Sequence, residues 1–201
     1  MSLSNYAGLT ASVADWLHRS DLTTPIADFV VIAENRINRE VRCADMETAY
    51  TGTIAAGVIA VPTDFLEWKA VYIDSNGATR LQPKSWEWVL QNYPTRSASG
   101  LPKFIARNAS NFEFGPYPDS TYSVKGTYYK RLAAVASSWH NLATEYPDLY
   151  LFGTLVAAAP YIGDDPRIPM WNSMYETIRD SINQEAVKAD ISGAPLVMTR
   201  G

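Results

Sequence analysis

The stretch TEYPDLYLFGTLVAAAPYIGDDPRIPMW, residues 144–171, decides the fold of this chain. Pro147 suits a first helical turn, and the helix predicted after it is apolar on nearly every side. Asp165 and Pro166 then mark a turn, with Asp165 placed to cap a second, amphipathic helix. Such a hairpin must bury surface on more than one side, against helices of its own chain or against a neighbouring subunit.

Helices are also predicted at the start of the chain, over residues 4–18 and 24–41, with Thr24 as the N-cap of the second. The second helix carries its apolar residues at helical spacing: Ile26, Phe29, Val30, Ala33, Ile37 and Val41. The helix after Pro169 has a narrower stripe: Trp171, Tyr175, Ile178, Ile182, Ala186 and Ala189. Each stripe indicates one buried face.

Between residues 46 and 131 the composition shifts to Thr, Tyr, Val and Gly, and alternating patterns predict strands. Ala56-Gly57 and Asn76-Gly77 are typical of hairpin turns, and 85–91 predicts a short helix. We expect an antiparallel sheet or a small open barrel. The predicted class is α+β: residues 1–45 and 138–190 form one helical bundle, 46–131 a central antiparallel β-rich insertion, and 191–201 a C-terminal tail.

Composition narrows the functional classes. The 201 residues are 47% hydrophobic and 19% charged, which suffices for a packed core. A net charge of -4 argues against tight nucleic-acid binding, which needs clustered Lys and Arg. No apolar run approaches the length of a membrane span. The lone Cys43 excludes an internal disulfide and a cysteine zinc site, and we expect it to be buried.

No catalytic, cofactor-binding or metal-binding residues are predicted. His18 and His140 lack a second ligand at helical spacing. A glycosidase needs two carboxylates held across the scissile bond. The acidic residues cluster as Asp45 with Glu47, Asp64 with Glu67, and Asp164 with Asp165, and we interpret them as caps, turns and strand ends. Hydrolysis of a cell-wall glycan, with Asp64 and Glu67, stays a weaker alternative.

Two groups of residues are candidates for contact with partners. Arg36, Arg39 and Arg42 form either a solvated helix face or an interface with a neighbouring subunit or another protein. Trp86 and Trp88 lie about 200° apart in a helix, so one is expected in the core and the other exposed as a partner anchor. If exposed aromatic side chains of the β insertion form the main contact surface, the chain is a stand-alone module that binds a glycan or peptide through that insertion.

An ordered set of segments carries a resemblance to a known family: NRINREVR at 35–42, VPTDFLEW at 61–68, FEFGPYPDSTYSVKGTYYKR at 112–131 and PDLYLFGTLVAAAPYIGDD at 147–165. Together they resemble the head-to-tail adaptor (connector) proteins of tailed phages, particularly short-tailed phages and prophages. The resemblance implies a non-enzymatic homo-oligomeric ring, usually of twelve subunits, docked beneath the portal protein.

In such a ring the helical cores pack side by side and the β insertion meets the next tail component. Double-stranded DNA passes through the lumen without specific binding. The C-terminal tail reaches toward the portal, which makes Leu196, Val197 and Met198 candidate contacts. The implied location is the head–tail interface of the virion, with the host cytoplasm as the site of assembly and with no membrane or cofactor involved.

Overall fold

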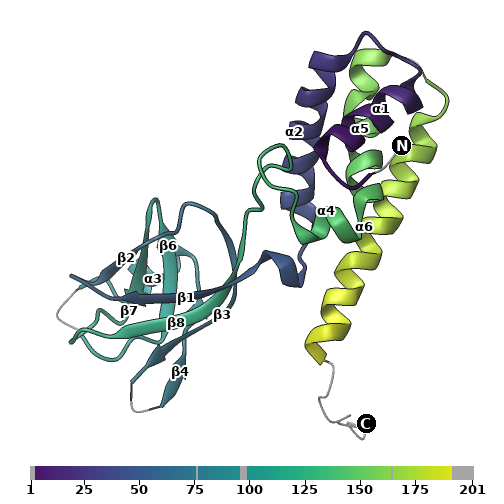
Figure 1. The fold of residues 1–201 in the computed structure, drawn as a ribbon. Coiled ribbons are helices and arrows are strands. Elements are labelled where there is room, and N and C mark those ends of the chain that lie inside the picture. The colour runs from purple at the N-terminus through teal and green to yellow at the C-terminus, as the bar shows by residue number, and fades with distance from the viewer. Residues whose placement is uncertain (1–2, 76, 96–98, 164, 192–201) are drawn as a thin grey trace, which may run out of the picture. The chain divides into compact units, whose positions relative to one another are not determined.

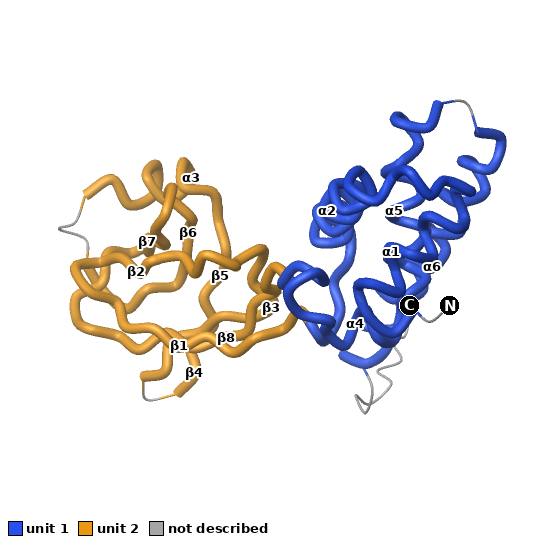
Figure 2. Tube along the Cα trace, turned by 45° about the horizontal axis from the view of Figure 1, so that its top comes forward, with its two compact units in different colours: residues 1–45, 132–201 blue, residues 46–131 orange. Residues whose placement is uncertain are grey.

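The computed structural model describes residues 3–75, 77–95, 99–163 and 165–191. The chain divides into two compact units (Figures 1 and 2). Residues 1–45 and 132–201 make up the helical unit, and residues 46–131 make up the β unit. All described strands lie in the β unit, and all described α-helices except one short one lie in the helical unit. The α+β class expected from the sequence is confirmed.

The described part of the helical unit contains five α-helices: α1 (Tyr6–Leu17), α2 (Thr23–Glu40), α4 (Asn141–Glu145), α5 (Pro147–Ile162) and α6 (Ile168–Ile191). A 3-10 turn, η1 (Ala44–Met46), ends its first segment. The Asn5 side chain caps α1 by accepting the Gly8 N–H at 2.8 Å. Helix α2 begins at Thr23, and Thr24 lies inside it instead of capping it. The residue before the helix, Leu22, is buried and makes no capping hydrogen bond with its side chain. The start of α2 is therefore held by packing, where we predicted a side-chain cap.

Helix α5 contacts all four of the other helices described in this unit. Its buried residues lie on several sides of the helix: Leu149, Tyr150, Leu151, Gly153, Thr154, Leu155 and Ala158. The sequence predicts that this helix is apolar on nearly every side, and helices of the same chain cover most of that apolar surface. The helix runs through Pro160 to Ile162, because a proline this close to the end removes little of the hydrogen-bond ladder.

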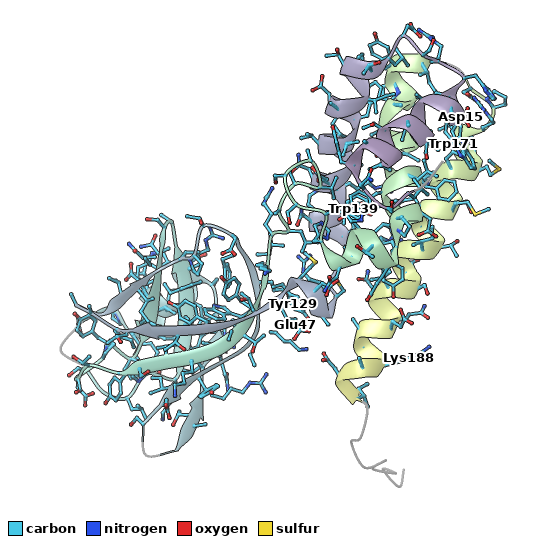
Figure 3. The ribbon with its side chains drawn as sticks, viewed as in Figure 1. Asp15, Glu47, Tyr129, Trp139, Trp171 and Lys188 are labelled. Carbon is cyan, nitrogen blue, oxygen red and sulfur yellow. The ribbon has the colours of Figure 1, made fainter. Side chains whose placement is uncertain are left out.

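Helix α6 starts where the sequence predicts. Asp165 accepts the Arg167 N–H at 2.9 Å and closes the turn before Ile168. Its buried residues are Trp171, Tyr175 and Ile182, while Ala189 is exposed. Figure 3 labels Trp171 near the start of the helix and Lys188 near its end. The predicted stripe is thus buried in the first part of α6 and emerges into solvent in the last turns.

The described part of the β unit contains two four-stranded sheets and one short helix, α3 (Trp86–Asn92). The first sheet has the order β1 (Glu47–Thr53), β8 (Ser123–Lys130), β3 (Phe65–Asp74), β4 (Ala78–Arg80). The second has the order β2 (Val58–Ala60), β7 (Asn111–Gly115), β6 (Phe104–Asn108), β5 (Gln82–Pro83). The pairing is antiparallel except between β5 and β6, which are parallel.

One core joins the two sheets: Ile54, Ile59, Val71, Ile73, Leu81, Ile105, Phe112, Phe114 and Val124. The Ala56-Gly57 turn forms as predicted, with φ of 51° and 82°. The strands beside it pair only at the Ala55–Val58 bridge and then diverge into different sheets. The strands therefore form two sheets that cover one shared core, where we expected a single antiparallel sheet or a small open barrel. The β3–β4 hairpin also forms, although residue 76 of its turn lies outside the described residues.

Candidate functional site

Large apolar side chains reach solvent mainly on the helical unit. Eight of the nine exposed ones in the described chain belong to it: Trp16, Val31, Ile32, Tyr161, Met170, Met174, Val187 and Ile191. Leu90, on α3, is the ninth. Exposed apolar side chains that gather on one unit mark contact surfaces more often than scattered ones do.

Two neighbouring pairs stand out within this set. The α2 pair, Val31 and Ile32, is 52% and 53% exposed, and the α6 pair, Met170 and Met174, is 47% exposed at each residue. The sequence held a signal for the α2 pair. Both residues interrupt the polar face of α2, opposite the apolar stripe that packs inside the helical unit. We did not identify them as candidates from the sequence.

The three candidate arginines of α2 and its end have different environments. Arg36 donates to Glu40 Oε1 at 3.0 Å and to Asn172 Oδ1 at 3.3 Å, and its guanidinium lies 4.1 Å from the centre of the Tyr175 ring. Arg42 donates to the backbone carbonyls of Asn38 and Val41. Both side chains are thus engaged within the helical unit.

Arg39 is the exposed member of the three. It lies seven and eight positions after the α2 pair, which places it about two helical turns further along the same side of α2. Among the described residues it has no ion pair. Its guanidinium is therefore the one of the three best placed for contact with another molecule.

Glu40 gathers the polar contacts between α2 and α6. It accepts hydrogen bonds from Arg36, from the Tyr175 hydroxyl at 3.1 Å and from Arg179 at 3.2 Å. Burial pushes the Glu40 pKa up, but the hydrogen bonds from Arg36 and Arg179 outweigh it, so the pKa lies below its ordinary value. The carboxylate stays charged and joins the two helices on which the exposed pairs lie.

Two asparagines, the buried Asn38 and the half-buried Asn183, hold the segments by which the chain leaves and re-enters the helical unit. Asn183 accepts the Arg42 N–H at 2.9 Å and donates to the Glu40 carbonyl at 3.0 Å. Asn38 accepts the Leu132 N–H at 2.9 Å. Beside it, Glu34 accepts the Val135 N–H, and burial raises the pKa of this carboxyl. The sequence did not reveal this role, because neither asparagine belongs to a recognisable motif.

The tryptophans of α3 are both half-buried, where we expected one buried and one exposed. Trp88 packs edge-on against Phe104 with ring centres 4.7 Å apart, and the Lys84 ammonium lies 5.2 Å from its ring centre. Trp86 lines a groove of about 240 Å³, the α3 groove, whose other walls include Leu90, Tyr93 and Tyr117. Of the two candidate anchors, Trp86 is the one beside an open hollow.

Three of the acidic residues considered for catalysis have structural partners. Asp64 accepts the Tyr128 hydroxyl at 3.0 Å, and burial followed by this contact raises the Tyr128 pKa to about 12. Glu47 pairs with Lys69 at 2.6 Å. The Arg167 guanidinium and backbone N–H lower the Asp165 pKa, the opposite of what a general acid needs. Asp164 lies outside the described residues, as do Leu196, Val197 and Met198.

Histidine and cysteine have structural positions too. His140 precedes α4 and lies 3.2 Å from the Tyr150 hydroxyl through Nε2, and burial lowers its pKa. Cys43 is buried, as expected. No group of three His, Cys, Asp or Glu in the described ranges is arranged to hold a metal ion. No described helix combines the length and apolar character that crossing a membrane requires.

A helical unit with several exposed apolar side chains, joined to a β unit with its own core, is typical of a structural protein that contacts other proteins. The chain belongs to the SU10 adaptor protein family, whose family model matches residues 4–199. It is accordingly a phage head–tail adaptor and a component of the virion. A comparison with curated proteins found no match.

Proposed function

We propose that this adaptor forms a homo-oligomeric ring of twelve subunits beneath the portal of a short-tail-type phage or prophage. The ring joins the portal to the next tail component and lets double-stranded DNA pass through its lumen. The observation that carries this proposal is the concentration of exposed apolar side chains on the helical unit. Burying such a side chain between subunits contributes roughly 1.5–3 kcal/mol.

The positions of the two exposed pairs support a ring. A cyclic ring needs two different faces on each subunit, and the α2 pair and the α6 pair supply them. Arg36 contacts Asn172, and Glu40 contacts Tyr175, Arg179 and Asn183 further along α6, so α2 and α6 run in the same direction. The two pairs therefore lie at similar heights along these helices, as a ring without axial rise requires.

Charge supports the passage of DNA. The helical unit has 8 Lys and Arg against 14 Asp and Glu, a net charge of -6, and the β unit has 9 against 7, a net charge of +2. Many copies of an acidic unit around a channel repel phosphates, whereas a basic channel would hold them. In this proposal Arg39 contributes to the subunit contact, and Leu196, Val197 and Met198 contribute to the portal contact.

Mixing the purified full-length protein with its cognate portal, followed by negative-stain imaging, tests the proposal. We expect an added ring of density on one face of the portal, with twelve-fold symmetry in class averages. Portals without added density, at protein concentrations well above those in assembly, contradict the ring. A mobility-shift assay with linear duplex DNA should show no complex at physiological salt.

A second candidate function has one observation in its favour. The α3 groove, with Trp86, Tyr93 and Tyr117 in its walls, has the aromatic lining that glycan and peptide sites use. Binding on a glycan array that Trp86→Ala abolishes would support a stand-alone binding module. The adaptor function predicts no ligand on the array.

A further inference from the structure

Strand β1 lies at one edge of the first sheet, and its ladder with β8 is unbroken over seven residue pairs. Figure 3 labels Glu47 and Tyr129, which form the first of these pairs. No strand in the described chain pairs with the outer side of β1 between residues 47 and 53. The backbone groups on that side therefore have no strand partner, and such groups attract another strand.

Hydrogen bonds identify which residues face outward. Ile54 donates its N–H to the Tyr122 carbonyl at 2.9 Å and so continues the ladder with β8. Successive residues of an antiparallel strand alternate between the two sides. Ala55 confirms the alternation, because its N–H and carbonyl bond to Val58 on the open side at 3.2 and 3.1 Å. The outward set is thus Glu47, Ala49, Thr51 and Thr53.

The other free edges of the β unit are poor templates. Strands β2 and β4 have three residues each, and β5 has two, of which Pro83 lacks an N–H. The part of β3 that β4 leaves uncovered contains two register shifts, which disturb pairing. Among the described strands, β1 therefore offers the longest regular open edge.

Nothing on the β1 side chains guards this edge. Natural edge strands are commonly protected by lysine, proline or a bulge. Ala49, Thr51 and Thr53 are exposed and uncharged, and Glu47 is neutralised by Lys69 at one end. On the inner face Tyr50 packs edge-on against Trp68 with ring centres 5.1 Å apart. An added strand would find an aromatic surface on its inner side and threonines on its outer side.

We infer that β1 binds an extended segment of the next tail component, which adds to the first sheet as a fifth strand. The inference rests on the proposed function, together with the implication of the family resemblance that the β insertion meets the next tail component. Backbone hydrogen bonds to Ala49, Thr51 and Thr53 hold the segment, and an apolar side chain of the segment contacts Tyr50.

The added strand comes from another protein and not from a second copy of the described chain. The remaining edges of a copy are too short to pair with β1. Pairing of β1 with β1 needs a two-fold axis, and neighbours in a cyclic ring with heterologous contacts are not related by one.

Proline substitutions on the outward set test this inference. Thr51→Pro removes an N–H that faces the open side, so the ladder with β8 is kept while the outer edge is blocked. Thr51→Val is the matched control, because it keeps the N–H and the strand propensity. Full-length variants are assembled on portals, imaged, and then titrated with the purified tail protein that follows the adaptor in the virion.

We expect Thr51→Pro to weaken capture of the tail protein by at least roughly tenfold, and Thr51→Val to stay within about twofold of wild type. All three proteins should add rings to portals. Wild-type capture by Thr51→Pro overturns the inference, as does equal weakening by both variants. Self-association of the free protein that Thr51→Pro abolishes would assign the edge to a second copy. Absence of rings for all three contradicts the proposed function instead.

Hydrogen exchange gives an independent measurement should Thr51→Pro fail to fold. In wild-type rings the amides of Ala49, Thr51 and Thr53 should gain protection when the tail protein is added. The amide of Tyr50, which already bonds to β8, should change little. Unchanged exchange at all three outward amides, with tail protein bound, overturns the inference.

Discussion

The helical unit and the β unit leave different chemistry at their surfaces. The helical unit exposes eight of the nine large apolar side chains that reach solvent in the described chain, and the β unit exposes Leu90. The β unit instead leaves the backbone of β1 open along seven residues. A helix satisfies its own backbone and can offer only side chains, whereas an edge strand offers hydrogen bonds. One chain thereby carries two kinds of contact surface.

The largest expected effect is a loss of stability in the β unit. A Cβ on Gly126, in β8, would lie 2.4 Å from the Ala70 carbonyl oxygen of the neighbouring strand. Gly126→Ala should lower the free energy of unfolding of the β unit by about 3 kcal/mol. Gly100→Ala is the control, since its Cβ would meet nothing closer than 3.8 Å. Urea unfolding followed by far-UV circular dichroism measures both, and equal stabilities would contradict the close packing of β8 on β3.

The next effect concerns the polar contacts of the helical unit. Asn38→Ala leaves the Leu132 N–H without its acceptor in a buried setting. We expect a loss of about 2 kcal/mol in the free energy of unfolding. Asp28→Ala, an exposed change on the same helix, should cost less than about 0.5 kcal/mol. A thermal melt that does not distinguish the two variants would refute the role given to Asn38.

The response to pH should also differ between the units. Burial holds the His140 pKa below the unfolded value of 6.5, so the unfolded chain takes up the proton first as pH falls. The helical unit therefore loses stability below about pH 6.5, and His140→Gln removes that part of the loss. The β unit contains no histidine and lacks this contribution.

Glu34 acts in the opposite direction within the same unit. Its pKa in the folded state is raised by burial, so its protonation as pH falls toward 4.5 favours the folded state. Glu34→Gln should remove this gain. Unfolding curves between pH 7 and pH 5 for wild type and both variants separate the two contributions, and identical curves for all three proteins would contradict both assignments.

The smallest effect compares two arginines of α2. Arg36→Ala removes contacts to Glu40, Asn172 and Tyr175 and should cost about 1 kcal/mol of stability. Arg39→Ala, on the exposed side, should leave the melting temperature unchanged and weaken assembly on the portal. A destabilised Arg39→Ala, or normal assembly by it, would remove Arg39 from the candidate interface.

Helix periodicity and turn chemistry predicted much of the fold. The apolar stripe of α2, the turn that Asp165 closes and the Ala56-Gly57 turn all depend on neighbouring residues, so local patterns reveal them. The division of the strands into two sheets depends on contacts such as that of β2 with β7, about fifty residues apart. Local alternation carries no information about such partners.

The candidate surfaces were harder to predict. The sequence gives the identity of Val31 and Ile32, but their exposure depends on which helices cover α2. Arg36 and Arg39 look equivalent in the sequence, and only the position of α6 distinguishes them. The open edge of β1 follows from sheet order, which no local motif encodes.

Assembly on the portal by matched surface variants tests the central claim most directly. Val31→Glu with Ile32→Glu places charge on the α2 pair, and Leu90→Glu places charge on the exposed apolar residue of the β unit. Both proteins should melt like wild type. Negative-stain counts of portals with an added ring should fall to background for the α2 variant and stay at the wild-type level for Leu90→Glu. Wild-type ring counts for the α2 variant, or loss of rings in Leu90→Glu alone, would contradict the claim that the helical unit carries the assembly surface.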